Sequence, residues 1–139
     1  MGQPGLILID SSVWIEGLRA DGAAGCRETI DDLLAQERAA TCEVVVAEIL
    51  RGAASEAKLS LLTQGFEGVI CLGMVGAGRE AGRLSFILRQ RGLSIPTADL
   101  LITGTARLHG AALLHRDRHI AEAAAAAGVI ALEPGAPLS

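Results

Sequence analysis

Four acidic residues stand near points where a strand or a turn gives way to a helix. Asp10 ends a run of four branched apolar residues, and Asp117 lies just past another apolar run. Glu48 falls on the helix expected after the second strand, and Asp99 falls in the first turn of a helix that follows a proline. In open α/β sheets, ligands bind at the carboxyl ends of the strands. We therefore expect the four carboxylates to converge on one edge of a sheet.

Converging carboxylates are suited to a divalent metal ion. Like charges packed together raise one another's pKa unless a cation compensates, and Mg²⁺ or Mn²⁺ suits an all-oxygen site. Such an ion polarises a phosphodiester and generates hydroxide from water. Each acid also has an ordinary structural explanation: Asp10 as a helix cap, Glu48 on a solvated helix face, Asp99 as a helix-dipole partner and Asp117 in a turn.

The elements that must position these acids alternate between strands and helices. The apolar runs predict strands at 6–9, 39–42, 69–72, 111–114 and 129–132. The helical spacing of apolar residues predicts helices at 13–18, 26–34, 44–50, 55–64, 79–91, 98–109 and 120–127. The segment 44–50 has β-branched content, but its spacing favours a helix. Ser11 or Ser12 is expected to cap the first helix and Thr97 the sixth. The alternation predicts an α/β fold, a three-layer α/β/α sandwich around a central, mainly parallel sheet.

The composition limits the class of protein. The 139 residues suit one domain, 1–139, with a core at about 6–132 and a tail at 133–139. Half of the residues are hydrophobic and the mean hydropathy is +0.42, which favours an apolar surface reserved for a partner. We expect neither a membrane helix nor a signal peptide. Three widely spaced cysteines, Cys26, Cys42 and Cys71, suit free thiols in the cytoplasm. With a net charge of −4, the protein is less basic than many nucleic-acid-binding proteins.

Four segments in order along the chain resemble the motifs of PIN-domain proteins, particularly the VapC-like ribonuclease toxins of toxin–antitoxin pairs. They are Leu8–Ile15, Val46–Gly52, Ile95–Ile102 and Leu113–Ile120, and the similarity extends from about Leu6 to Leu132. The resemblance implies an α/β/α fold and a Mg²⁺- or Mn²⁺-dependent ribonuclease. It also implies that the catalytic and metal-binding acids are those already singled out: Asp10, Glu48, Asp99 and Asp117.

The chain departs from the family pattern around the fourth motif. His115 stands where the family often has Thr or Ser, Ile120 where it often has Phe, and His119 where a further acid is sometimes found. His115 and His119 could ligate Zn²⁺ together with Asp117, or they could support the site from outside it. We expect Ser12 and His115 to have such a supporting role.

These features predict a metal-dependent endoribonuclease in which activated water attacks phosphorus in line. One alternative is a catalytically impaired PIN-like interaction module. A second alternative is an aspartyl-phosphate phosphotransfer domain with Asp10 as the nucleophile. That class uses a late lysine, whereas the only lysine here, Lys58, lies in the middle of the chain.

The substrate and the partners follow from the resemblance and the composition. The single tryptophan, the two phenylalanines and the absence of tyrosine leave few platforms for base stacking. Recognition of single-stranded or looped RNA should therefore depend on phosphate contacts from the eleven arginines. Codon bias in an Ala-, Gly- and Arg-rich proteome explains the excess of arginine over lysine equally well. The resemblance implies a small antitoxin, and we expect it in an apolar groove around Trp14, Leu18 and Leu50. A symmetric homodimer through another face is expected as well.

Overall fold

Within the part of the chain that the structure describes, five short parallel strands form the centre. The computed structural model describes residues 5–23 and 25–135, so part of the predicted tail, 136–139, lies outside the described residues. The sheet has the order β3-β2-β1-β4-β5, and every pairing is parallel. The strands are β1 (Ile7–Ile9), β2 (Ala39–Thr41), β3 (Ile70–Cys71), β4 (Ala112–Leu114) and β5 (Ala131–Leu132). Because β1 lies in the middle, all three of its residues are buried.

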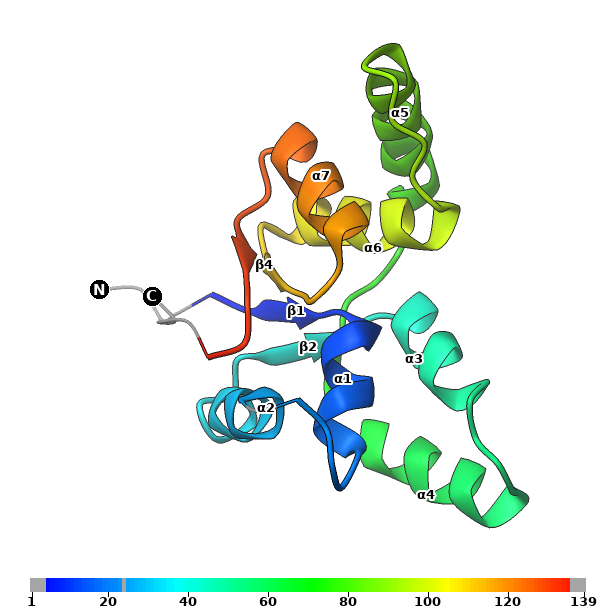
Figure 1. Cartoon of the computed structure of the whole chain (residues 1–139), viewed down its shortest axis with the longest axis vertical. Helices are drawn as coiled ribbons and strands as arrows, with labels where there is room; N and C mark the ends of the chain where they lie inside the picture. Colours follow the sequence, from blue (N-terminus) through cyan, green and yellow to red (C-terminus); the bar gives the residue numbers. More distant parts are fainter. Residues whose placement is uncertain (1–4, 24, 136–139) are drawn as a thin grey trace.

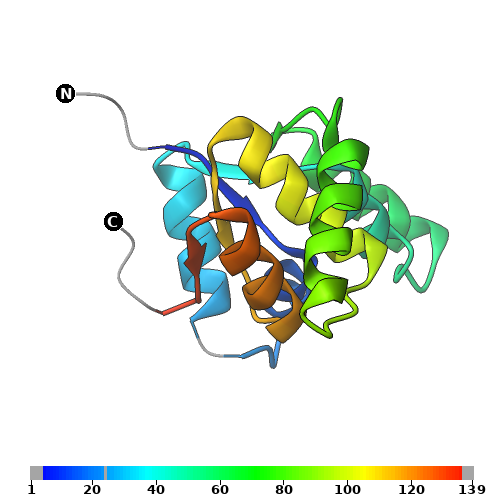
Figure 2. The same ribbon diagram turned by 90° about the horizontal axis from the view of Figure 1, so that it is seen from above.

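Seven helices cover the sheet within the described residues, in two groups that follow the chain. They are α1 (Ser11–Leu18), α2 (Cys26–Ala35), α3 (Glu43–Leu50), α4 (Glu56–Phe66), α5 (Ala77–Gln90), α6 (Thr97–His109) and α7 (Arg118–Ala127). Among the first four, α1 contacts α2 and α3, and α3 contacts α4; the last three pack together. In Figure 1, α1 and α2 lie on one side of β1 and β2, whereas α6 and α7 lie on the other. Figure 2 shows α5, α6 and α7 side by side on that second side. The predicted α/β/α sandwich is confirmed.

The strand order reverses direction in the middle of the sheet. The chain moves outward from β1 through β2 to β3, and then it returns to the other side of β1 to form β4 and β5. The helices that follow β1 and β4 therefore leave the sheet on opposite sides. Ligands in doubly wound sheets bind at such a switch point, outside the carboxyl ends of the strands. Asp10 and the loop that carries Asp117 follow β1 and β4 at this point.

The segment with mixed sequence signals forms the helix α3. Val45 and Ile49, one helical turn apart, are buried in the main core, while Glu48 is only partly buried. Burial of this apolar stripe outweighs the strand preference of the β-branched residues, which is small and depends on context. The helical interpretation of 44–50 is confirmed, and it places Glu48 on the same helix turn as the core contacts.

The predicted helix caps are wrong at two positions. Asp10 is the N-cap residue of α1, and its carboxylate accepts the backbone N–H of Ser12, so both serines already lie inside the helix. Pro96 precedes α6 in an extended conformation, and its carbonyl accepts the N–H of Leu100 at 3.2 Å. Thr97 is therefore the first helical residue rather than the cap. Among the described residues, no helix has the length and apolar character needed to cross a membrane.

Candidate active site

Asp10 is a buried carboxylate held in place by the start of α1. Its side chain is 2 % exposed. One oxygen, Oδ2, accepts hydrogen bonds from the backbone N–H of Ser12 at 3.2 Å and from the Ser12 hydroxyl at 2.5 Å. The Ser12 hydroxyl in turn accepts the backbone N–H of Arg116 at 3.0 Å, which ties the end of β4 to Asp10. The other oxygen, Oδ1, is buried and receives no hydrogen bond from any described residue.

Glu48 is fixed by the neighbouring serine of the same helix start. The Ser11 hydroxyl donates to Oε1 of Glu48 at 2.9 Å, across 37 positions of sequence. Successive side chains of α1 thus hold two different acids: Ser11 holds Glu48 on α3, and Ser12 holds Asp10. The sequence interpretation missed Ser11, although the Ser-Ser pair directly after a buried acid was the available signal.

Asp99 and Asp117 lie at the N-termini of two packed helices. Asp99 is in the first turn of α6, and Asp117 is the N-cap residue of α7. Oδ1 of Asp117 accepts the backbone N–H groups of His119 at 2.7 Å and Ile120 at 3.4 Å. The His119 Nδ1 lies 3.8 Å from Oδ2 of Asp99 and 3.8 Å from Oδ1 of Asp117. Asp99, Asp117 and His119 each offer one ligand atom within 4.8 Å of the others.

The two histidines of the fourth motif have different surroundings. His115 is 4 % exposed, and its Nδ1 accepts the backbone N–H of Asp117 at 3.1 Å. This bond assigns the proton of a neutral imidazole to the other ring nitrogen. His115 thus holds the backbone of the residue that carries the acid, whereas His119 joins the carboxylates. Of the two predicted zinc ligands, only His119 belongs with Asp117 to the cluster that could hold a metal.

The acids perturb one another electrostatically. Burial, followed by the charges of Asp117, Asp10 and Glu48, raises the pKa of Asp99 to about 6. Burial is also the main cause that raises the pKa of Asp10, with a contribution from Asp117. The pKa of Glu48 rises through burial and through the charges of Asp10 and Asp117, although the hydrogen bond from Ser11 opposes this. The fold therefore brings all four predicted acids into one interacting group, which we call the acidic site.

The acidic site fits a divalent cation. A buried carboxylate oxygen without a donor is costly, and neighbouring negative charges oppose ionisation of Asp10, Glu48 and Asp99. A bound cation would satisfy the free oxygen of Asp10 and offset this repulsion. The donors are carboxylate oxygens with one imidazole at the edge, a set that hard or borderline divalent ions accept.

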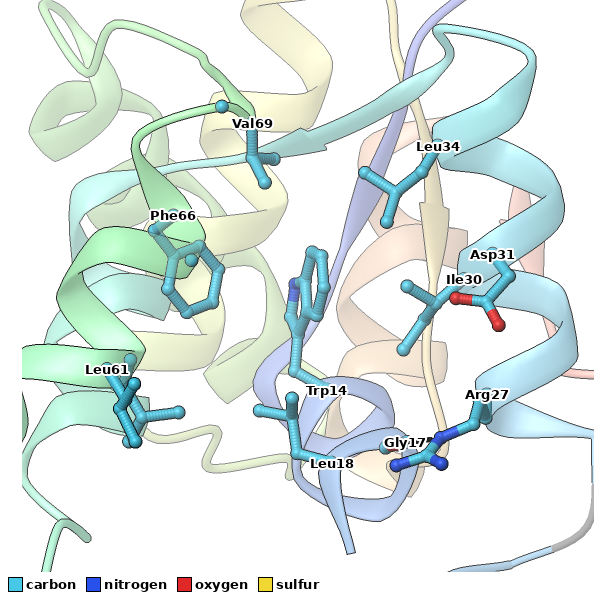
Figure 3. Close-up of a pocket in the computed structure, with 13 residues that line it drawn as sticks. Trp14, Gly17, Leu18, Arg27, Ile30, Asp31, Leu34, Leu61, Phe66 and Val69 are labelled. Carbon is cyan, nitrogen blue, oxygen red and sulfur yellow. Dashed lines mark hydrogen bonds between the residues drawn. The ribbon is translucent and has the colours of Figure 1, made fainter. Parts of the chain in front are cut away.

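A concave feature lies away from the acids, further along α1. A groove of about 660 Å³ runs between α1, α2 and α4. Figure 3 shows Trp14 opposite Phe66 across it, with Ile30 and Leu34 on the α2 side. The two rings meet edge to face, with centroids 5.1 Å apart. The prediction of an apolar groove around Trp14 and Leu18 is confirmed, but Leu50 does not line it; α4 supplies that wall instead. We call this feature the apolar groove.

Comparisons with known proteins agree with the motifs. The family model described as PIN domain matches residues 7–126. The VapC ribonuclease Mb1587 of Mycobacterium bovis is 35 % identical over 117 residues, which is 81 % of this chain and 87 % of the relative. Ribonuclease VapC11 of Mycobacterium tuberculosis matches with the same identity and coverage.

Solved structures show the same fold. The VapBC-5 toxin–antitoxin structure from Mycobacterium tuberculosis aligns with a TM-score of 0.69 at 24 % identity, covering 94 % of this chain and 99 % of the other. VapBC2 from Rickettsia felis, bound to a DNA fragment from its promoter, aligns with a TM-score of 0.74 at 20 % identity over 92 % and 98 %. FitAcB from Neisseria gonorrhoeae aligns with a TM-score of 0.71 at 21 % identity over 91 % and 96 %.

Proposed function

The chain belongs to the PIN-domain family, in its VapC ribonuclease branch, and from this premise we propose how it cleaves RNA. Asp10, Glu48, Asp99 and Asp117 hold Mg²⁺ or Mn²⁺ at the carboxyl ends of β1 and β4. One observation carries the proposal: Oδ1 of Asp10 is buried and has no donor among the described residues, in a carboxylate that interacts electrostatically with three other acids. When bound, the divalent ion lowers the pKa of water and polarises the phosphodiester.

The protein's own residues keep the acids in a fixed arrangement. Ser12 and the start of α1 hold one oxygen of Asp10 and leave the other free. Ser11 orients Glu48, and the α7 backbone holds one oxygen of Asp117. Because these bonds come from helix starts, little reorganisation is needed when charge develops at the phosphorus. His115 holds the backbone N–H of Asp117 and so fixes the loop between β4 and α7.

The RNA backbone is recognised beside the acidic site. Arg116 and Arg118 flank Asp117 and line a hollow of about 510 Å³, to which Asp117 and Glu133 also contribute. Arg116 is paired with Glu16 at 3.2 Å, which leaves Arg118 as the freer cation. Guanidinium groups bind phosphate through paired N–H groups, and their net effect weakens as salt rises. We propose that this hollow contacts phosphates next to the one that is cleaved. Single-stranded or looped RNA is the substrate class, because a flexible strand can reach both features together.

The apolar groove is the proposed seat of a small antitoxin. The similar solved structures are toxin–antitoxin complexes. Helix-in-groove recognition needs apolar anchors, and the groove offers Trp14, Leu18, Leu61 and Phe66. Arg27 and Asp31 at its rim provide polar contacts that would fix the orientation of the bound segment. A homodimer through another face and a cytoplasmic location, favoured by three free cysteines, complete the proposal.

Metal removal tests the enzymatic part of the proposal. The purified chain should cleave a single-stranded RNA in Mg²⁺ or Mn²⁺, lose cleavage in excess chelator and regain it when the ion is returned. Cleavage that persists undiminished in chelator would exclude the metal mechanism. A chain that binds RNA and metal but cleaves nothing would instead identify the impaired interaction module. The aspartyl-phosphate alternative has no support, since Lys58 lies on α4, the helix that lines the apolar groove.

A further inference from the structure

His119 stands where it can coordinate whatever ion the acidic site holds. Its Nδ1 lies 3.8 Å from a carboxylate oxygen of Asp99 and 3.8 Å from one of Asp117. These separations are too long for hydrogen bonds, which would bring nitrogen and oxygen to about 3 Å. They match the spacing of ligands that share an ion, since two bonds of about 2.1 Å place their ligand atoms roughly 3 to 4 Å apart.

The position of His119 is set by the fold rather than by a flexible surface loop. It lies in the first turn of α7, and its backbone N–H donates to Asp117 at 2.7 Å. The helix α7 packs against α6, which carries Asp99 in its own first turn. The His119 side chain is 39 % exposed, so an ion and its remaining water ligands have access.

A second observation indicates that an ion belongs there. Asp10 is 2 % exposed, and its Oδ1 has no donor among the described residues. The charge of Asp10 raises the pKa of Asp99, so this unpartnered carboxylate lies within electrostatic range of the cluster. The cluster therefore combines two carboxylates with one imidazole nitrogen, and the unpartnered carboxylate of Asp10 lies near it.

We propose that His119 supplies a nitrogen ligand to the divalent ion held by Asp99 and Asp117, which makes the site favour Mn²⁺ and Co²⁺ over Mg²⁺. Imidazole suits the transition metals, whereas Mg²⁺ strongly prefers oxygen ligands and retains its water. This inference rests on the proposed function, because it concerns the same metal site. It goes further by assigning a ligand and an ion preference that the four acids alone do not provide.

The test measures ion binding rather than catalysis. Mn²⁺ and Mg²⁺ are titrated separately by calorimetry into the wild type, His119→Asn and His119→Asp. We expect His119→Asn to lower Mn²⁺ affinity by about tenfold or more and to change Mg²⁺ affinity much less. His119→Asp, which restores an oxygen ligand, should reverse the preference and favour Mg²⁺. Pulsed electron paramagnetic resonance of bound Mn²⁺ should show a nitrogen coupling in the wild type and lose it in both variants.

His109→Asn is the matched control. His109 ends α6 at the opposite end from Asp99 and contacts the Gly73 carbonyl at 2.8 Å, so this variant should keep the nitrogen coupling. A rise in the affinity for both ions in His119→Asn would overturn the inference and show that His119 is a cation that competes with metal. An unchanged nitrogen coupling in that variant would also overturn it, while the metal-dependent function would stand. Failure of the wild type to bind either ion would overturn both.

Discussion

The helix α1 separates two regions of opposite chemistry. Its N-terminus carries Asp10 and the serines that hold the acidic site. One to two turns later, Trp14 and Leu18 line the apolar groove. Hydrogen bonds to the first residues of helices hold the acidic site together, and repulsion between its carboxylates destabilises it. Apolar side chains of three helices form the groove, and their exposure to water is unfavourable.

This difference indicates what each region lacks in the free chain. A cation would relieve the acidic site, because its charge offsets repulsion among carboxylates whose pKa values are raised. An apolar segment would relieve the groove, because it removes Leu18 and Leu61, which are 45 % and 64 % exposed, from water. The two regions should therefore respond to different changes, and the following experiments separate them.

Asp10→Asn should have the largest effect. Asparagine keeps an acceptor for the N–H of Ser12, so the α1 cap and the fold should persist. The substitution removes the charge of the buried ligand, and we expect RNA cleavage to fall by about 100-fold or more. The rate of RNA cleavage measures the loss of activity, and circular dichroism shows whether the fold persists. Asp31→Asn, an exposed acid at the rim of the groove, should cleave RNA normally. Normal turnover by Asp10→Asn would show that the ligands are misassigned.

Leu61→Asp should disable the groove and leave the acidic site intact. Leu61 is 64 % exposed, so the free chain should keep its stability and its RNA cleavage. Placing a charge among the apolar anchors should weaken binding of the proposed antitoxin by about 100-fold. Binding is measured with the two purified proteins. Leu59→Asp changes an exposed leucine of the same helix outside the groove and should bind normally. Equal affinity of Leu61→Asp and Leu59→Asp for the partner would show that the partner does not bind in the groove.

Asp99→Asn should stabilise the metal-free protein and change its response to pH. In the wild type the pKa of Asp99 is about 6 in the folded chain, above its ordinary value near 3.8. The folded state then binds more protons than the unfolded state between these values, so stability falls as pH rises from about 4 to about 7. After allowance for solvent screening, the loss should be roughly 1 to 2 kcal/mol. Denaturant unfolding in chelator measures it.

The comparison between wild type and Asp99→Asn isolates the acidic site in that experiment. The variant should show a flatter stability profile over the same pH range and exceed the wild type at pH 7. Added Mg²⁺ or Mn²⁺ should stabilise the wild type more than the variant. Identical pH profiles for the two proteins would mean that Asp99 does not carry the electrostatic strain assigned to it.

Ser11→Ala should have the smallest effect of the four. It removes one hydrogen bond to Glu48, worth about 1 kcal/mol, so ion affinity should fall by about fivefold. Ser11→Thr keeps the hydroxyl and should restore the affinity. Groove binding should be unaffected by either change. Equal ion affinity in Ser11→Ala and the wild type would show that Glu48 needs no support from α1.

Much of the fold followed from local patterns. The strand β1 is a run of adjacent apolar residues, and the helical stripe of α3 identified a helix despite its β-branched residues. The spacing of apolar residues indicates which residues are buried, so the bounds of these elements were predictable to within a few residues. The helix caps were not, because Asp10 and the serines after it are all good capping residues and only the backbone conformation decides among them.

The sequence by itself determined which acids follow strands and open helices, since a carboxylate next to an apolar run is a local feature. The tertiary structure alone decided which other residues join them. Ser11 meets Glu48 across 37 positions, and the Arg116 backbone meets Ser12 across 104. His119 reaches Asp99 because α6 and α7 pack together, and α4 rather than Leu50 closes the groove. Such contacts depend on how the helices pack against the sheet. The residues that form them are far apart in the sequence, so no periodic pattern indicates which residues will meet.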